Sequence, residues 1–346
     1  MDHTPPRITH RHIAEVVGVH RATVSLALKN HPSIGLETRE RIKAVAEELG
    51  YRPDPMLSAL AAYRQLNTQP VFQGVIAWLA LSTKAYRWSD IPIFQSYFDG
   101  ARKAADRYGY QMEVFELNDL RMSPKRLASV LRARSFNGIL LAPQPHAGAE
   151  LEFPWEHFSA VTFGYTLRHP QLHLVSSTQQ RAIVATMREL RDRGYQRIAF
   201  AYEPTHDERV DHNYIAGYLL DRQMAKAKVL MAPATDYASA KGKFHTWIRA
   251  QKVDAIVTGN YKILAALAQA GVRVPQDLGV ACPSLPRADL GVAGVHEDAE
   301  TIGKIAVEFL IASMQRGERG IPDAAQRILL EGKWVEGASL RPPPSE

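Results

Sequence analysis

The sequence of 346 residues has almost no cysteine. Its single cysteine, Cys282, cannot form an internal disulfide bond, and a zinc site that needs several thiolates is excluded. This composition is typical of the reducing cytoplasm, where we expect the protein to act, with neither a metal ion nor another cofactor. Because Cys282 lies inside an apolar segment, we interpret it as a packed thiol and not as a catalytic nucleophile.

The sequence also lacks a long hydrophobic run. The stretch between Arg64 and Lys84 carries no charge, but polar residues and a proline interrupt it, and its apolar centre at 71–81 is too short to span a bilayer. The first twelve residues contain no apolar core of a secretion signal. We therefore expect no membrane partner.

Phosphate-binding and hydrolase motifs are missing as well. No G-x-G-x-x-G follows the first predicted strand, and the sequence has no G-x-x-x-x-G-K-[ST] and no G-x-S-x-G. We therefore expect that the protein is not an enzyme. The net charge of +6 permits nucleic-acid binding but does not locate a site for it.

Three short helices are predicted in the first fifty residues. The first follows a cap at Thr9, the second runs from about His20 to Leu28, and the third ends at Gly50. After residue 71, apolar runs alternate with amphipathic segments, which predicts parallel sheets covered by helices. The strands are expected at 75–81, 111–117, 138–143, 159–164, 197–202, 255–259 and 278–283. The helices are expected near 94–108, 124–134, 179–193, 211–224, 239–250, 261–270 and 298–315.

Ala14, Gly18 and Val24 have the A-x3-G-x5-V spacing of a helix-turn-helix. Alanine allows the second helix to pack closely, glycine allows a positive φ in the turn, and valine fills the contact between the helices. A second helix held in this way can enter the major groove of DNA. Taken alone, the spacing is also compatible with a chance pattern in a small helical domain.

The surrounding sequence resembles the DNA-binding headpiece of the LacI/GalR family of bacterial repressors. The matching motifs are IAEVVGV, RATVS, ETRERI and AEELGYRPDP, followed later by GVRVPQDLGV (271–280), IGKIAVEFL (302–310) and LLEGKWVEGAS (329–339). The resemblance implies a small all-α helix-turn-helix domain and an α/β core of two Rossmann-like parallel-sheet lobes, similar to periplasmic binding proteins.

The resemblance also implies an order of domains. The headpiece covers 1–52, a hinge helix and linker cover 53–70, and a core for effector binding and dimerisation covers 71–346. Lobe 1 is expected at about 71–166 plus 297–322, and lobe 2 at about 167–296 plus 323–340.

The implied partner is a double-stranded DNA operator, bound by a homodimer. By resemblance, Arg21, Ala22 and Leu26 face base edges, whereas Thr23, Ser25 and Lys29 contact phosphates. Arginine can donate two hydrogen bonds to guanine, a discrimination of about 1–3 kcal/mol. His20 stands where the family has a serine cap, and histidine is expected to cap this helix poorly.

The segment PMLSALAAYR matches the hinge helix of the family. That helix orders when two subunits pair on an operator, and a leucine then wedges into the minor groove. Leu60 occupies the matching position, and Met56 and Leu57 lie beside it. The alternative is that these three side chains pack on the core.

The resemblance further implies a small-molecule effector between the lobes. The matching positions are Phe94, Tyr237 and Asn260, and the alternative for the aromatic residues is core packing. Sugar-binding members carry an arginine where this chain has Tyr214, and an aspartate where it has Ser284. A monosaccharide therefore lacks its usual charged partners, and the effector stays unidentified.

We interpret the chain as a sequence-specific transcriptional regulator, most simply a repressor. The alternative is a cytoplasmic small-molecule-binding protein of the same core fold with a degenerate headpiece. A histidine metal site near the N-terminus is disfavoured because His10 and His12 point to different faces of a helix.

Overall fold

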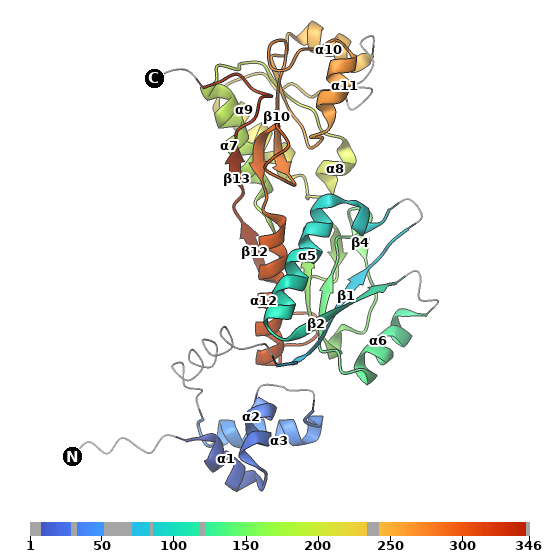
Figure 1. The fold of residues 1–346 in the computed structure, drawn as a ribbon, viewed down its shortest axis with the longest axis vertical. Coiled ribbons are helices and arrows are strands. Elements are labelled where there is room, and N and C mark those ends of the chain that lie inside the picture. Colours follow the sequence, from blue (N-terminus) through green and yellow to red (C-terminus); the bar gives the residue numbers. More distant parts are fainter. Residues whose placement is uncertain are drawn as a thin grey trace, which may run out of the picture.

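The computed structural model describes residues 8–28, 33–51, 71–83, 86–117, 122–233 and 242–343. A headpiece of three helices lies at one end of the molecule, and two α/β lobes follow it in a line (Figure 1). The headpiece helices are α1 (His10–Val17), α2 (Arg21–Leu28) and α3 (Leu36–Glu48). The predicted fold class, a small helical domain before an α/β core with parallel sheets, is confirmed.

The first lobe is built on a six-stranded sheet in the order β12-β7-β5-β3-β1-β2, in which every pair is parallel. Its strands are β1 (Gly74–Ala80), β2 (Tyr110–Glu116), β3 (Gly138–Leu141), β5 (Ser159–Phe163), β7 (His173–Ser177) and β12 (Arg327–Leu330). Helices α5 (Pro92–Arg107), α6 (Pro124–Ala133) and α12 (Ala299–Arg316) cover it. A two-stranded sheet of β4 (Ala149–Glu150) and β6 (Leu167–His169) lies beside it.

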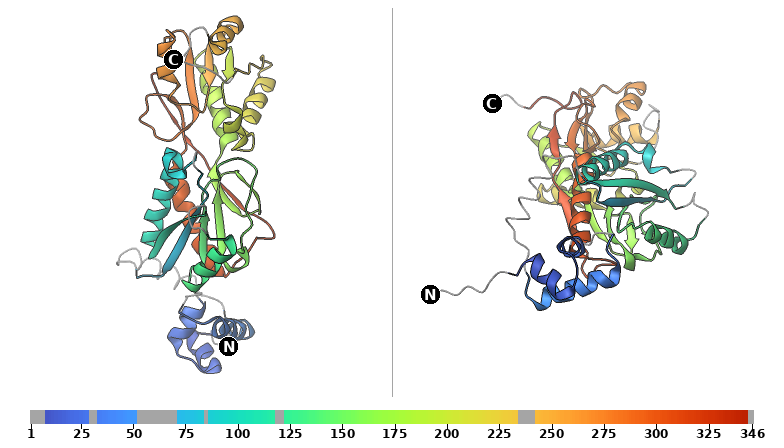
Figure 2. Two further views of the ribbon diagram at one scale, coloured as in Figure 1. Left: turned by 90° about the vertical axis from the view of Figure 1, so that its right-hand side faces the viewer. Right: turned by 60° about the horizontal axis from the view of Figure 1, so that its bottom comes forward.

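Strand β1 shows why helices cover both faces of this sheet. Successive side chains of a strand point to opposite faces, so an apolar run buries both. Ile76 and Trp78 pack in the core formed with α5 and α12. Ala77 and Leu79 pack in a separate core formed with α6. Figure 2 shows α5 and α12 side by side along the first lobe.

The second lobe is built on a five-stranded sheet in the order β13-β11-β10-β9-β8, parallel except for the β11–β13 pair. Its strands are β8 (Ile198–Phe200), β9 (Ala255–Val257), β10 (Gly279–Leu285), β11 (Ala293–His296) and β13 (Lys333–Val335). Its helices are α7 (Gln179–Asp192), α8 (Pro204–Glu208), α9 (Asn213–Met224), α10 (Lys243–Gln251) and α11 (Ile263–Gln269). Among the described residues, no helix has the length and apolar character needed to cross a membrane.

Two strands correct the predicted division of the core. The prediction placed 167–296 and 323–340 in the second lobe, but β7 and β12 both belong to the first sheet. They pair with each other in parallel, with Leu174 opposite Arg327 and Ser177 opposite Leu330. The chain therefore passes between the lobes after Ser177 and after Leu330, later than predicted in both cases.

Candidate nucleic-acid interface and interlobe contact

Helices α1 and α2 form the predicted helix-turn-helix. Gly18 ends α1 with a φ of 74°, and its N–H donates to the carbonyl of Ala14 at 2.9 Å. A residue in the left-handed conformation at this position ends the helix, and glycine adopts that conformation without a Cβ clash. Ala14 and Val24 are buried in one core with Ile42 of α3. The spacing of the motif therefore sets the angle at which α2 leaves α1.

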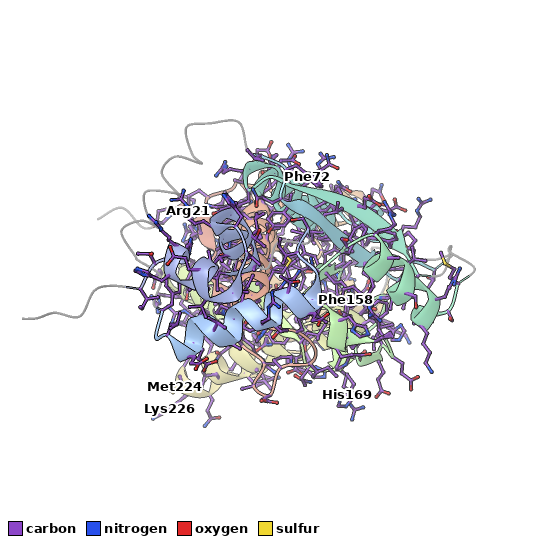
Figure 3. The ribbon with its side chains drawn as sticks, turned by 90° about the horizontal axis from the view of Figure 1, so that it is seen from below. Arg21, Phe72, Phe158, His169, Met224 and Lys226 are labelled. Carbon is purple, nitrogen blue, oxygen red and sulfur yellow. The ribbon has the colours of Figure 1, made fainter. Side chains whose placement is uncertain are left out.

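Helix α2 has one buried face and one open face. Val24 and Ala27 lie in the headpiece core. The open face carries the predicted DNA contacts that the structure describes, of which two are exposed, Arg21 and Ala22, and three are half-buried, Thr23, Ser25 and Leu26. Figure 3 views the molecule from the headpiece end, with Arg21 labelled. The other predicted DNA contacts lie outside the described residues: Lys29, Met56, Leu57 and Leu60.

The expectation that His20 caps α2 poorly is wrong. Its Nδ1 atom accepts a hydrogen bond from the N–H of Ala22 at 3.2 Å, as the oxygen of a serine cap would. The carbonyl of His20 also accepts from the N–H of Thr23 at 2.9 Å. Because a backbone N–H is the donor, Nδ1 is the acceptor in this bond.

Two further histidines fix helix α1. The N–H of Thr9 donates to Nδ1 of His12 at 3.1 Å, so His12 takes the place that a glutamate has in a capping box. Nε2 of His10 lies 2.7 Å from the hydroxyl of Tyr51, the residue at the end of the described headpiece. Within the described ranges, no group of three or more histidine, cysteine or acidic side chains is placed to hold a metal ion. These histidines serve the geometry of the helices.

Arg209 makes a polar contact between the lobes. It lies between α8 and α9 of the second lobe and donates through Nη1 to the carbonyls of Gln144 at 2.8 Å and Pro145 at 2.6 Å in the first lobe. Its Cζ atom is 5.5 Å from the ring centroids of both Tyr86 and Phe94. We call this group of five residues the interlobe contact. Phe94, a predicted effector contact, thus faces an arginine of the chain itself.

Arg209 was not predicted from the sequence. The resemblance implies an arginine at the position of Tyr214, and Arg209 stands five positions earlier. A search for any arginine in the segment between the strand at 197–202 and the next helix would have included it. The identity of its partners in the first lobe follows only from the fold.

A second cluster lies behind this contact, at the base of the second lobe. The hydroxyl of Tyr214 donates to Oε1 of Glu297 at 3.0 Å, and the rings of Tyr202 and Tyr214 lie 5.0 Å apart. All three side chains are buried. Burial raises the pKa of Glu297 to about 7, although the hydrogen bonds from Tyr214 and Ser177 act in the opposite direction. Glu297 was not predicted from the sequence.

The remaining predicted effector contacts take different environments. Ser284 lies on β10, with its hydroxyl 3.9 Å from Sγ of the buried Cys282. Burial raises the pKa of Cys282 to about 12, which agrees with a packed thiol. Asn260 is exposed, and its Oδ1 accepts from the N–H of Lys262 at 3.1 Å in the turn before α11. Tyr237 lies outside the described residues.

Two protein-family models match this chain. Residues 9–54 match "Bacterial regulatory proteins, lacI family" and residues 187–340 match "Periplasmic binding protein-like domain". Among curated relatives, the HTH-type transcriptional regulator KdgR of Bacillus subtilis is 23% identical, over 97% of this chain and 99% of its own. The HTH-type transcriptional regulator PtxS of Pseudomonas putida is 24% identical, over 98% of each chain.

Solved structures of the same fold cover almost the whole chain. The complex of the transcriptional regulator CelR with cellobiose has a TM-score of 0.57 and 21% identity, covering 96% of this chain and 100% of that one. The lac repressor dimer bound to its operator and the anti-inducer ONPF has a TM-score of 0.53 and 16% identity, covering 96% and 99%. At such identities the similarity establishes the fold of headpiece and core together.

Proposed function

Because this chain belongs to the LacI family of DNA-binding transcriptional regulators, we propose that it is a repressor with a near-palindromic operator. It acts in the cytoplasm as a homodimer, and a small molecule held between the lobes sets its affinity for DNA. The observation that carries the proposal is the open face of α2. That face presents Arg21 and Ala22 to solvent while Val24 and Ala27 hold the helix in the headpiece core.

Arg21 is the base-reading residue of the proposed interface. Its guanidinium has no ion pair with any described residue, so its donors are available to the O6 and N7 atoms of a guanine. Ala22 and Leu26 offer only apolar contact, which suits thymine methyl groups. Thr23, Ser25 and Lys29 bind phosphates and fix the position of α2 along the duplex.

The hinge segment completes the proposed interface. Leu60, with Met56 and Leu57 beside it, wedges into the central step of the operator, and the bent duplex then contacts more of the protein. A single headpiece buries too little surface for tight binding, which is why we propose a dimer with two half-sites. These three residues lie outside the described residues, and their role rests on the resemblance.

The effector site is proposed at the interlobe contact. The related CelR structure contains cellobiose, and the lac repressor structure contains an anti-inducer. In this chain Phe94 and Arg209 lie at the contact itself, and the buried Tyr214 and half-buried Ser284 lie behind it. Asn260 and Tyr237, the latter outside the described residues, are assigned to the site by the resemblance alone. Since Arg209 already bonds two carbonyls of the first lobe, an effector changes the lobe arrangement by competing for this contact.

Selection from a random duplex library at near-physiological salt tests the proposal. We expect an enriched pseudo-palindrome whose centre contains a flexible pyrimidine–purine step, as a leucine wedge requires. The matched variant Leu60→Ala should lose the enrichment and keep weak, salt-sensitive binding. If the wild-type protein enriches no sequence, alone or with a cell extract that supplies effectors, the proposed repressor function is wrong and the headpiece is degenerate.

A further inference from the structure

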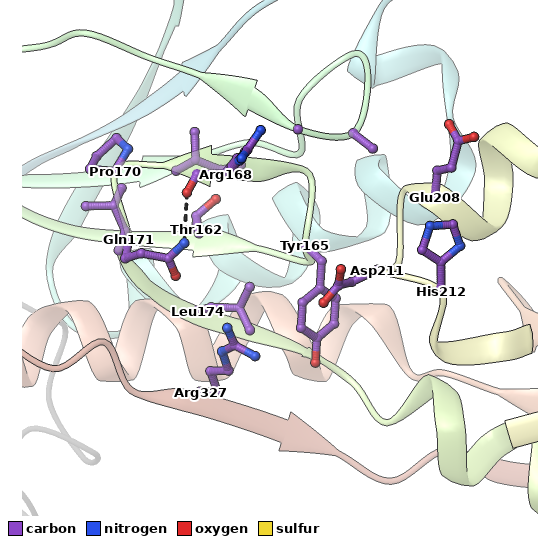
Figure 4. Close-up of a pocket in the computed structure, with 14 residues that line it drawn as sticks. Thr162, Tyr165, Arg168, Pro170, Gln171, Leu174, Glu208, Asp211, His212 and Arg327 are labelled. Atoms are coloured by element: carbon purple, nitrogen blue, oxygen red, sulfur yellow. Dashed lines mark hydrogen bonds between the residues drawn. The ribbon is translucent and has the colours of Figure 1, made fainter. Parts of the chain in front are cut away.

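A pocket of about 420 Å³ lies beside the interlobe contact and is lined by both lobes. Its first-lobe wall contains Tyr165, Arg168 and Arg327, and its second-lobe wall is the turn between α8 and α9 (Figure 4). We call it the side pocket. None of the predicted effector contacts that the structure describes lines it, and Arg209 donates to the carbonyls of Gln144 and Pro145 outside it.

The first-lobe wall carries two guanidinium groups that the described parts of the chain leave without a carboxylate. Arg168 is on β6 and Arg327 is on β12, and both side chains are exposed. Neither forms an ion pair with a described residue, although most of the ion pairs in these ranges use arginine. Cζ of Arg327 lies 5.7 Å from the ring centroid of Tyr165, which holds the guanidinium at the wall. Arginine in a concave site binds carboxylates and phosphates with two parallel hydrogen bonds.

The second-lobe wall is held in a fixed conformation. Asp211 and His212 both have a positive φ, 54° and 58°, which is rare for residues other than glycine. Asp207, which is buried, maintains the turn: its Oδ2 lies 3.0 Å from Nδ1 of His212 and its Oδ1 accepts from the N–H of Ile215 at 3.1 Å. Unusual backbone conformations of this kind persist where the surrounding structure enforces them, often at ligand sites.

The same wall carries two carboxylate side chains. Glu208 and Asp211 line it, and among the described residues neither has an ion-pair partner. Ionised carboxylates only accept hydrogen bonds, so they suit hydroxyl or ammonium groups of a ligand. The pocket therefore has an end that attracts anions on one lobe and an end that accepts hydrogen bonds on the other.

We propose that the side pocket binds a small organic anion that also carries hydroxyl or amino groups. Its carboxylate or phosphate binds Arg168 and Arg327, and its donors face Glu208 and Asp211. This site is additional to the effector site proposed above. Because its two walls belong to different lobes, a ligand stabilises the lobe arrangement in which both walls reach it.

Isothermal titration calorimetry on the full chain without DNA tests this site independently of any DNA-binding function. The probes are gluconate and glucose 6-phosphate, which combine an anion with hydroxyl groups, together with inorganic phosphate and neutral glucose. We expect at least one of the two hydroxylated anions to bind, and glucose not to bind. Comparison of gluconate with glucose 6-phosphate distinguishes a carboxylate ligand from a phosphate ligand.

Variants assign the binding to the pocket. Arg327→Gln and Arg168→Gln should each weaken it by about tenfold or more, because a charge-assisted hydrogen bond is lost. Arg126→Gln, an exposed arginine on α6, should leave it unchanged. Unchanged melting temperatures show that the variants fold. The proposal is overturned if neither hydroxylated anion binds, or if the two pocket variants bind as well as wild type.

Discussion

Arg21 in the headpiece and Arg209 between the lobes show two different uses of the same side chain. Arg21 is exposed, and no described carboxylate pairs with it. Arg209 is half-buried, donates to two carbonyls and lies over two aromatic rings. The first arginine is ready for an external partner, whereas the second already donates to the chain through Nη1, although its buried Nη2 has no hydrogen-bond partner among the described residues. A ligand that takes the Nη1 donors must therefore replace existing bonds, and a DNA duplex at α2 need not replace any.

The largest effect is expected behind the interlobe contact, at Glu297. Its pKa is raised from 4.5 to about 7 by burial, so the folded protein binds more protons than the unfolded chain between these pH values. The contribution of this group to the free energy of unfolding is therefore highest below pH 4.5. It falls as the pH rises and levels off above 7. A shift of this size corresponds to about 3 kcal/mol.

Glu297→Gln removes this titration and retains an oxygen that accepts from Tyr214. We expect the variant to gain stability over wild type progressively between pH 4.5 and 7, measured by thermal unfolding across that range. Glu300→Gln is the matched control, because Glu300 is exposed in an ion pair with Lys103. Parallel pH profiles for wild type and Glu297→Gln would contradict a buried, titrating carboxyl.

The interlobe contact itself is tested by Arg209→Gln. The charged donor of two hydrogen bonds to the first lobe is lost, at a net cost of about 1.5–3 kcal/mol. We expect faster amide exchange at 142–146 and 203–213, roughly tenfold or more, because the lobes separate more often. Exchange in α6 should stay the same, and Arg126→Gln should change neither segment. Equal exchange rates in Arg209→Gln and wild type would mean that other contacts hold the lobes together.

The same contrast explains which parts could be predicted from sequence. Ala14, Gly18 and Val24 lie within two consecutive helices and the turn between them, so their spacing in the sequence is enough to predict the geometry of that turn. Arg209 reaches Gln144 and Pro145, which precede it by 65 and 64 residues, and no local pattern encodes that contact.

Strands β7 and β12 were missed for a related reason. The segment HLVSS of β7 has two buried serines, Ser176 and Ser177, and does not read as an apolar run. The RILL segment of β12 is short, with alternate residues exposed, and its partner lies far back in the chain. Strand β7 joins the first sheet through β5, and β12 joins it through β7, so the lobe boundaries differ from the predicted positions.

In the headpiece, Arg21→Ala is expected to relax sequence preference and to leave the fold intact. Affinities for the selected operator and its single-base variants should lose about 1–3 kcal/mol of discrimination at one symmetric base pair in each half-site. Arg11→Ala is the matched control, since Arg11 is exposed on α1 and pairs with Glu15 at 3.0 Å. An unaltered preference in Arg21→Ala would show that this arginine contacts only the DNA backbone or solvent.

The smallest effect is expected at the cap of α2, where two substitutions of the same residue, His20, can be compared. His20→Ala removes the bond from the N–H of Ala22 to Nδ1 and should cost about 1 kcal/mol of headpiece stability, as the loss of other caps does. His20→Ser supplies an oxygen in the same place and should restore it. Amide exchange in α2 of the full chain measures both. If the amides of α2 are as well protected from exchange in His20→Ala as in wild type, the turn at Gly18 alone positions the helix. The imidazole then contributes nothing to the start of α2.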